Sequence, residues 1–313
     1  MEEQGDFLRT ILSFKCLGID TANQRDLICI LRKYKNFHFE NTSDIFYFIR
    51  NQFAHSMISK REIDDAWSAG GKYIDKIIKE EIKVLVWGSS TYPKLLLRLK
   101  NPPSLLLVKG NAKFDLPTIA IVGTRTASSW GREVASRLAG MASSSGFAVV
   151  SGLAVGIDSA AHLGAVETKG ITWAILPSSF DNLYPQENMT LANKIVERGG
   201  ALISEYLPGT KSEADYFIQR DRIQAGLSLA VLVIETEKDG GTWHTISFAK
   251  EVGAPLFVTL TEETLDKKIN NSLQTSEHRL GVKKLIKEGA EKISSDSNFS
   301  EILKYIIKNN VAT

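Results

Sequence analysis

Small residues cluster at three points where a strand-like segment gives way to a helix-like one, and these points are the best candidates for chemistry. The candidate binding residues at the three turns are Gly123, Thr124 and Arg125, then Ser151, Gly152 and Gly156, then Gly240, Gly241 and Thr242. At such a turn the helix amides without partners and the positive end of the helix dipole attract anions. Glycine also serves tight turns and close packing, so one such turn is weak evidence. Three turns on one edge of a sheet predict a phosphate-binding site.

A segment with one aromatic residue and two arginines opens the helix expected at residues 217–227. We expect Arg220 and Arg222 to bind phosphate oxygens and Phe217 to stack on a nucleobase, because guanidinium groups and aromatic rings make these contacts. The alternatives are a core contact for Phe217 and salt bridges from the arginines to Asp221 or Glu205.

Two further polar residues complete the predicted site. Lys211 follows a Pro-Gly pair in a loop, which suits a phosphate contact. Asp158 lies at the start of the helix after the second turn, where a carboxylate can hold the turn in place or reach a ligand hydroxyl. We expect Asp158 mainly to orient the loop.

The motifs give little support to catalysis, metals or cofactors. The turns match neither the dinucleotide pattern G-x-G-x-x-G nor the P-loop pattern G-x-x-x-x-G-K-[ST]. There is no H-E-x-x-H zinc pair and no G-x-S-x-G nucleophile elbow, and His162 is expected to pack within its helix. Cys16 and Cys29 lack metal-ligand spacing, and Cys29 is expected to be a buried structural thiol. We therefore expect no catalytic residue, no metal and no cofactor.

The elements that position the turns follow from an alternation of strand and helix patterns. Apolar strand candidates cover residues 118–122, 147–151, 171–176, 200–204, 229–235 and 255–259, and helix-length segments lie near 129–145, 157–168, 187–199, 217–227 and 243–252. Continuous apolar strands separated by helices indicate a parallel sheet covered on both faces. The predicted fold class is α/β, a doubly wound and mostly parallel sheet that binds ligands beyond the carboxyl ends of its strands.

The pattern changes along the chain and suggests four segments. They are an N-terminal helical domain (1–82), a linker with lead-in strands (83–117), the α/β domain (118–290) and a C-terminal helix (291–313). Within the first segment, Ser59 and Glu62 have the spacing of a capping box at the start of a helix. All three turns fall within the α/β domain.

Composition sets the class of protein and the way it could meet nucleic acid. The 313 residues are 43% hydrophobic and 24% charged, as in globular proteins with a buried core. No run of 18 apolar residues predicts a membrane span, and the acidic N-terminus is unlike a secretory signal, so we expect a cytoplasmic protein without a membrane partner. Residues 118–260 carry 11 Lys and Arg against 14 Asp and Glu, a net charge of −3. Binding of nucleic acid would therefore depend on a local group of cations.

Six motifs follow one another in a specific order and spacing: IAIVGTR (119–125), SGLAVGIDSAAH (151–162), LPSSFDNLYPQEN (176–188), LISEYLPGT (202–210), FIQRDRIQAGLS (217–228) and GGTWHT (240–245). With the upstream run at 91–111, they resemble the DNA-processing protein A family, also called DprA or Smf. The resemblance implies an extended Rossmann-like domain that binds single-stranded DNA without catalysis, protects incoming DNA in natural transformation, hands it to the recombinase RecA and forms a homodimer. By position it places Gly123, Arg125, Gly152, Gly156, Asp158, Phe217, Arg220 and Arg222 in the DNA-contacting motifs.

The resemblance also bears on the flanking segments. It implies that the N-terminal helices take the place of a sterile-alpha-motif-like domain. The chain stops where many members carry a winged-helix domain, so that module is expected to be absent.

Departures from the family pattern leave other functions open. The family usually reads F-P-x-R-N-R-I, whereas this chain has Gln219 and Asp221 in that motif and Trp243 in the third turn. Added negative charge and a lost cation are expected to weaken DNA binding. The alternative is therefore a Rossmann-like sensor of a small nucleotide, in a defence or signalling pathway. A nucleoside-monophosphate phosphoribohydrolase would need a glutamate one turn into the helix that follows the third turn. Here no acidic residue follows the glycine pair before Glu251.

Overall fold

The computed structural model describes residues 2–33, 58–259 and 273–310, and it divides the chain into two compact units. The first unit comprises Met1–Tyr92 and Asn101–Leu105, and the second comprises Pro93–Lys100 and Leu106–Thr313. The part of the predicted helical domain at 34–57 lies outside the described residues.

The first unit is mainly helical in the part that the structure describes. It contains α1 (Glu2–Cys16), α2 (Thr21–Lys33), α4 (Lys60–Lys79) and the short strand β1 (Lys83–Val86). Phe14, Leu27, Leu31 and Ile63 form its buried core. The expectation that Cys29 is buried is wrong, because residues 27, 28 and 31 turn inward along α2 and leave Cys29 on the exposed face.

The predicted capping box at the start of α4 is confirmed. The Ser59 amide donates to the Glu62 carboxylate at 2.7 Å, and the Glu62 amide donates to the Ser59 hydroxyl at 3.3 Å. Two amides at the helix start thus have acceptors that the helix itself cannot supply.

Ser59→Ala is expected to lower the free energy of unfolding by about 1 kcal/mol, because the Ser59 hydroxyl accepts from the Glu62 amide and donates to the Glu62 carboxylate. Urea unfolding followed by circular dichroism measures the change. Lys60→Ala at the next, exposed position is the matched control and should change the free energy by less than about 0.5 kcal/mol. Equal losses in the two variants would contradict a stabilising cap.

The second unit holds the α/β fold. Its strands are β2 (Leu105–Gly110), β3 (Thr118–Val122), β4 (Ala148–Ser151), β5 (Thr172–Ile175), β6 (Ala201–Ser204), β7 (Ala230–Val233), β8 (Leu256–Thr259) and β9 (Glu291–Ile293). They lie in the order β2-β6-β5-β4-β3-β7-β8-β9. Strands β3 to β9 pair in parallel, while β2 runs antiparallel to β6.

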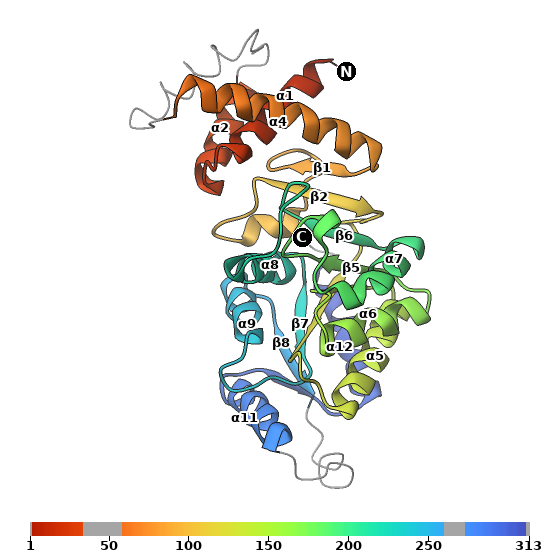
Figure 1. Ribbon diagram of the computed structural model, residues 1–313. Coiled ribbons are helices and arrows are strands. Elements are labelled where there is room, and N and C mark those ends of the chain that lie inside the picture. The colour runs from red at the N-terminus through yellow and green to blue at the C-terminus, as the bar shows by residue number, and fades with distance from the viewer. Residues whose placement is uncertain (1, 34–57, 260–272, 311–313) are drawn as a thin grey trace. The chain divides into compact units, whose positions relative to one another are not determined.

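Helices cover both faces of this sheet. They are α5 (Ser129–Ser144), α6 (Ile157–Glu167), α7 (Met189–Glu197), α8 (Ala214–Gly226), α9 (Thr242–Glu251), α11 (Leu273–Lys287) and α12 (Asp296–Asn310). Figure 1 shows α8, α9 and α11 on one face and α5, α6, α7 and α12 on the other. The predicted mostly parallel α/β fold is confirmed.

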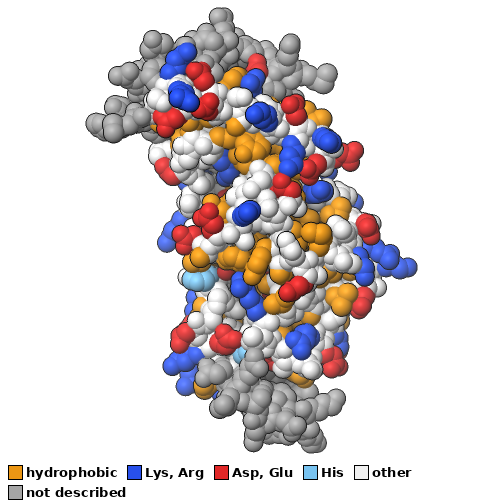
Figure 2. Space-filling view, in the orientation of Figure 1, with side chains coloured by type: hydrophobic (Ala, Val, Ile, Leu, Met, Phe, Trp, Pro, Cys, Tyr) orange, Lys and Arg blue, Asp and Glu red, His pale blue; other side chains and the backbone are white. Residues whose placement is uncertain are grey.

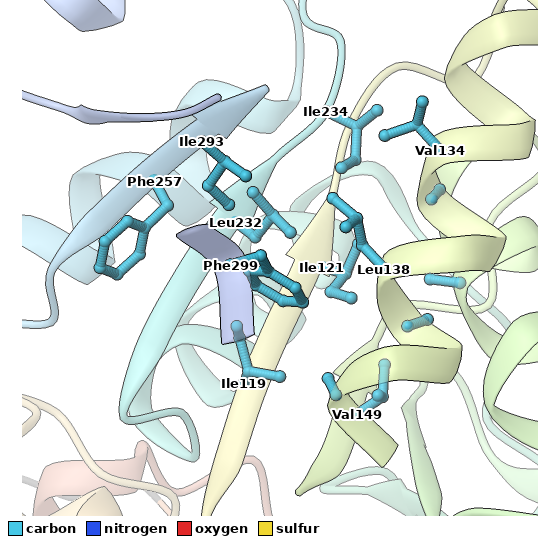
Figure 3. Close-up of a cluster of buried hydrophobic side chains, with 14 of the residues drawn as sticks. Ile119, Ile121, Val134, Leu138, Val149, Leu232, Ile234, Phe257, Ile293 and Phe299 are labelled. Carbon is cyan, nitrogen blue, oxygen red and sulfur yellow. The ribbon is translucent and has the colours of Figure 1, made fainter. Parts of the chain in front are cut away.

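The main hydrophobic core explains why these segments form this sheet. Strand residues Ile119, Ile121 and Leu232 pack with Leu138 of α5 and Phe299 of α12, all nearly inaccessible to solvent (Figure 3). Each central strand is buried on both faces, which accounts for the continuous apolar runs in the sequence.

Strand order determines where a ligand can bind. From β3 the chain proceeds through β4, β5 and β6 on one side and then crosses to β7 on the other side of β3. The first turn follows β3, the second follows β4 and the third follows β7. The carboxyl edge at this reversal of strand order is the usual ligand site of doubly wound sheets.

Within the described residues, no helix combines the length and the apolar character that crossing a bilayer requires.

Candidate nucleic-acid interface

Two adjoining cavities lie at the carboxyl edge of the sheet, within the second unit. The first, about 640 Å³, is formed by the first turn, Asp158, and the beginnings of α8 and α9. The second, about 790 Å³, is formed by the second turn, residues 181–187, Met189 and Lys211. Both are lined by Arg125, Ala154, Phe217 and Arg220. The structure thus brings the three turns and the start of α8 together, as the motifs predict.

An aromatic and cationic group stands where the two cavities meet. The Arg125 guanidinium carbon lies 5.0 Å from the centre of the Phe217 ring, within range of a cation–π contact. Tyr184 meets the same ring edge-on, with ring centroids 5.5 Å apart and planes at 83°. Arg125 is exposed and Tyr184 is 45% exposed. An exposed ring and a half-buried ring beside a guanidinium form a surface on which nucleobases can stack.

Sequence reasoning missed Tyr184. It lies in a loop before α7, 33 positions from Phe217, and the Tyr-Pro pair in the motif at 176–188 was its one local signal. Its place beside Phe217 depends on the tertiary fold.

Arg220 forms the floor between the cavities. It is buried, and its Nη1 donates to Gln224 at 3.1 Å and lies 3.7 Å from Asp158 Oδ2. Its Nε lies 3.1 Å from Asp221 Oδ1. The arginine thus brings positive charge below the surface and offsets part of the charge of two buried carboxylates.

Gly152 is required by this arrangement. A Cβ at this position would lie 1.0 Å from Arg220 Nη1, so the guanidinium occupies the space that a side chain would need. Gly152 therefore has a packing role that the sequence did not predict, and its contact with a phosphate stays a prediction.

Gly152→Ala is expected to lower the free energy of unfolding by about 1–3 kcal/mol, because the buried guanidinium must leave its carboxylate partners. Urea unfolding measures the change. Gly241→Ala is the matched control, since a Cβ there meets nothing within 4 Å and the backbone has a negative φ. If the two substitutions cost the same, packing against Arg220 does not explain this glycine.

Burial governs the charges of Asp158 and Asp221. It raises the pKa of Asp158, against the opposing effect of Arg220. It also raises the pKa of Asp221 to about 6, helped by the nearby charge of Asp158 and opposed by Arg220. For Asp221 the loss of hydration thus outweighs an ion pair at 3.1 Å. The first cavity consequently becomes more negative as the pH rises through about 6.

Two amides of the first two turns are used within the protein. The Thr124 amide donates to Glu235 O at 2.8 Å, and the Gly152 amide donates to Asp158 Oδ2 at 3.0 Å. Asp158 thus holds the second turn from the start of α6. Ser151 is fully buried and its hydroxyl donates to Ile121 O at 2.7 Å. These contacts give the turns their shape and leave fewer donors for a phosphate than the sequence predicts.

Gly156 allows the backbone of the second turn to lie close to that of the first. Its φ of +89° is rarely accessible to other residues, and a Cβ would lie 2.4 Å from Thr124 O. It lines neither cavity, so its position does not fit the phosphate contact that the sequence predicts for it.

Carboxylates fix the first turn to the third. Glu235 accepts from the Ser128 amide at 2.9 Å and from the Ser128 hydroxyl at 2.6 Å. Glu237 Oε1 accepts from the hydroxyls of Thr124 at 3.0 Å and Thr126 at 3.2 Å. The Trp243 indole donates to Glu237 O at 2.8 Å, so this large residue braces the third turn. Gly241 and Thr242 line the first cavity, whereas Gly240 lines neither.

Arg222 does not reach the cavities. Its Nη2 donates to Glu205 Oε2 at 2.7 Å and its Nε to Gln219 Oε1 at 3.0 Å, the salt-bridge alternative considered above. Residues two apart on a helix point about 200° apart, so Arg220 and Arg222 cannot serve one face. Lys211 lies at the second cavity and is exposed, as a phosphate contact requires.

His162 packs inside the fold. It is fully buried, its Nδ1 lies 2.7 Å from the Thr172 hydroxyl, and burial lowers its pKa to about 3. Across residues 2–33, 58–259 and 273–310, no group of three or more His, Cys, Asp or Glu side chains is placed to hold a metal ion.

Surface charge is mixed. On the face shown in Figure 2, acidic and basic side chains of the described residues are interspersed. Affinity for a polyanion therefore has to come from local cations such as Arg125 and Lys211.

Comparison with known proteins decides the family. A family model described as DNA recombination-mediator protein A matches residues 83–304. The chain belongs to this family. Protein Smf of Borreliella burgdorferi is 31% identical over 245 residues, which are 76% of this chain and 72% of that protein. The chain spans between 50% and 79% of the length of the curated relatives that it matches.

Solved structures of family members agree with this fold. DNA processing protein A of Streptococcus pneumoniae matches with a TM-score of 0.69 and 26% identity, over 91% of this chain and 94% of that one. DNA processing protein A of Helicobacter pylori matches with a TM-score of 0.60 and 26% identity, over 73% of this chain and 97% of that one. The structure of the Helicobacter protein concerns its single-stranded DNA binding mode. The resemblance to the DprA/Smf family and the Rossmann-like fold are confirmed.

Proposed function

We propose that this DNA recombination-mediator family member binds single-stranded DNA at the two cavities, without catalysing a reaction on it. Exposed Arg125 and Lys211 hold phosphates, and buried Arg220 adds positive charge from below. Phe217 and Tyr184 stack on bases. Phosphate contacts with stacking give little sequence preference and a strong dependence on salt.

The contact between Arg125 and Phe217 carries the proposal. The Arg125 guanidinium lies 5.0 Å from the centre of the Phe217 ring, and both residues line the two cavities. This spacing would let one nucleotide contact the guanidinium with its phosphate and the ring with its base. The single-stranded DNA binding mode of the Helicobacter pylori relative supports this choice of ligand.

Arg125→Ala is expected to weaken binding of a labelled oligo-dT strand and to reduce the slope of log affinity against log salt by about 0.7, because one phosphate contact is lost. Fluorescence anisotropy at several salt concentrations measures both quantities. Arg132→Ala, in α5 and outside both cavities, is the matched control. Unchanged affinity and slope in Arg125→Ala would remove Arg125 from the site.

The finer part of the proposal concerns what happens to the bound strand. We propose that the protein protects the strand and assists loading of RecA, as a homodimer in the cytoplasm. The description of the family as recombination mediators supports this role. A strand-exchange assay on DNA coated with single-strand-binding protein tests it: faster RecA assembly with this protein supports the role, and no acceleration contradicts it.

A further inference from the structure

The two cavities carry different charge. In the first, carboxylates outnumber arginines: Asp158, Asp221 and Glu237 against Arg125 and Arg220, with His244 also in the lining. In the second, the order is reversed: Arg125, Lys211 and Arg220 against Asp181 and Glu187. A phosphate is therefore favoured in the second cavity, and the first suits a part of the nucleotide that donates hydrogen bonds.

Glu237 is the carboxylate of the first cavity that is open to a ligand. Asp158 and Asp221 are buried and lie against Arg220, whereas the side chain of Glu237 is 43% exposed. Its Oε1 is held by two threonine hydroxyls of the first turn. A carboxylate has about four acceptor positions, and within the part of the chain that the structure describes no hydrogen bond reaches Oε2.

The same cavity offers a stacking surface. Phe217 lines it together with Glu237, so a base that enters can meet an aromatic ring and an oriented carboxylate. Because Glu237 is fixed by the turn, the carboxylate does not have to be ordered when the base binds.

We propose that the first cavity takes a nucleobase with hydrogen-bond donors on its Watson–Crick edge, guanine above all, and that Glu237 recognises it. Guanine presents N1–H and N2–H side by side, and both can be directed at the two acceptor positions of Oε2, since those of Oε1 are taken by the threonine hydroxyls. Cytosine and adenine present one amino group, and thymine flanks its N–H with two carbonyl oxygens that a carboxylate repels. This inference rests on the proposed function, and it adds a base preference to a site that otherwise binds any strand.

The test compares two labelled strands by anisotropy at one salt concentration. One is a dT 20-mer, and the other is the same strand with three well-separated dG residues. The native chain is expected to bind the dG strand about tenfold more tightly. Replacing the guanines with hypoxanthine, which lacks the N2 amino group, should remove much of this difference. Glu237→Gln should reduce it to less than about twofold while binding of the dT strand persists.

Glu187→Gln, which removes a carboxylate from the second cavity, is the matched control and should keep the preference. Equal affinity of the native chain for both strands, or a preference that survives in Glu237→Gln, would overturn the inference while leaving the proposed function intact. Failure to bind either strand would instead overturn the proposed function.

Discussion

Phe217→Ala is expected to weaken binding of single-stranded DNA by about 5- to 100-fold, the largest effect among the residues of the two cavities. Base stacking on an aromatic ring contributes about 1–3 kcal/mol per base. The substitution also removes the ring under the Arg125 guanidinium and the edge contact with Tyr184. Without the ring, the base loses its stacking surface, and the side chains of Arg125 and Tyr184 lose the contact that holds them in position. Anisotropy titration of an oligo-dT strand measures the change.

A neighbouring aromatic residue provides the control. Tyr216 lies in the same helical turn but stacks on Tyr206, with ring centroids 4.2 Å apart, and lines neither cavity. Tyr216→Ala should therefore leave affinity within about twofold, even where it lowers stability. Phe217→Trp should retain binding, because it keeps a stacking surface. Equal weakening in Tyr216→Ala and Phe217→Ala would indicate a general effect on α8 and contradict stacking by Phe217.

Asp221→Asn is expected to raise the free energy of unfolding at pH 7 by about 3 kcal/mol. The pKa of Asp221 is about 6 in the folded chain, above its ordinary value near 3.8. Between pH 4 and 6 the folded chain retains a proton that the unfolded chain has released, so stability falls as the pH rises through this window. Above pH 6 the cost of burying the ionised carboxylate is complete, at 1.36 kcal/mol per pKa unit. Asparagine keeps the shape and avoids the charge.

Urea unfolding of both proteins between pH 4 and 7.5 measures this effect. The difference in stability between Asp221→Asn and the native chain should grow with pH and level off above pH 6. The difference in DNA affinity between the two proteins should also grow with pH and level off above pH 6, because the ionised carboxylate of the native chain repels the negatively charged strand. The difference between the two proteins is the informative quantity, because every group other than residue 221 is common to both. Asp215→Asn, on exposed α8 surface, should show no such difference. A pH-independent difference for Asp221→Asn would contradict its raised pKa.

Much of the fold could be predicted because its central strands are buried on both faces. Runs such as TIAIV in β3 and AVLV in β7 are continuously apolar, and helices of ordinary length separate them. The strand β9 escaped prediction because its three residues, Glu-Lys-Ile, have no apolar pattern and depend on pairing with β8. The antiparallel pairing of β2 with β6 is likewise decided by register between distant segments.

The candidate site was predictable in its location and less so in its contacts. Strand order alone brings the three turns to one edge, so their glycines and Arg125 could be grouped from the sequence. The sequence could not predict which amides remain free, because Glu235 and Asp158 accept hydrogen bonds from amides of the turns through tertiary contacts. Arg220 and Arg222 point to different sides of α8 because they are two residues apart on a helix. This difference could have been predicted from their spacing in the motif.

The most direct test of the account is a titration of labelled oligo-dT with the native chain at two or more salt concentrations, beside a duplex of the same length. The two exposed cations at the cavities, Arg125 and Lys211, predict a slope of log affinity against log salt of about −1.4. The single strand should bind more tightly than the duplex, because paired and stacked bases cannot reach Phe217. Salt-independent binding, equal affinity for the duplex, or no binding at micromolar protein would contradict single-stranded DNA as the ligand.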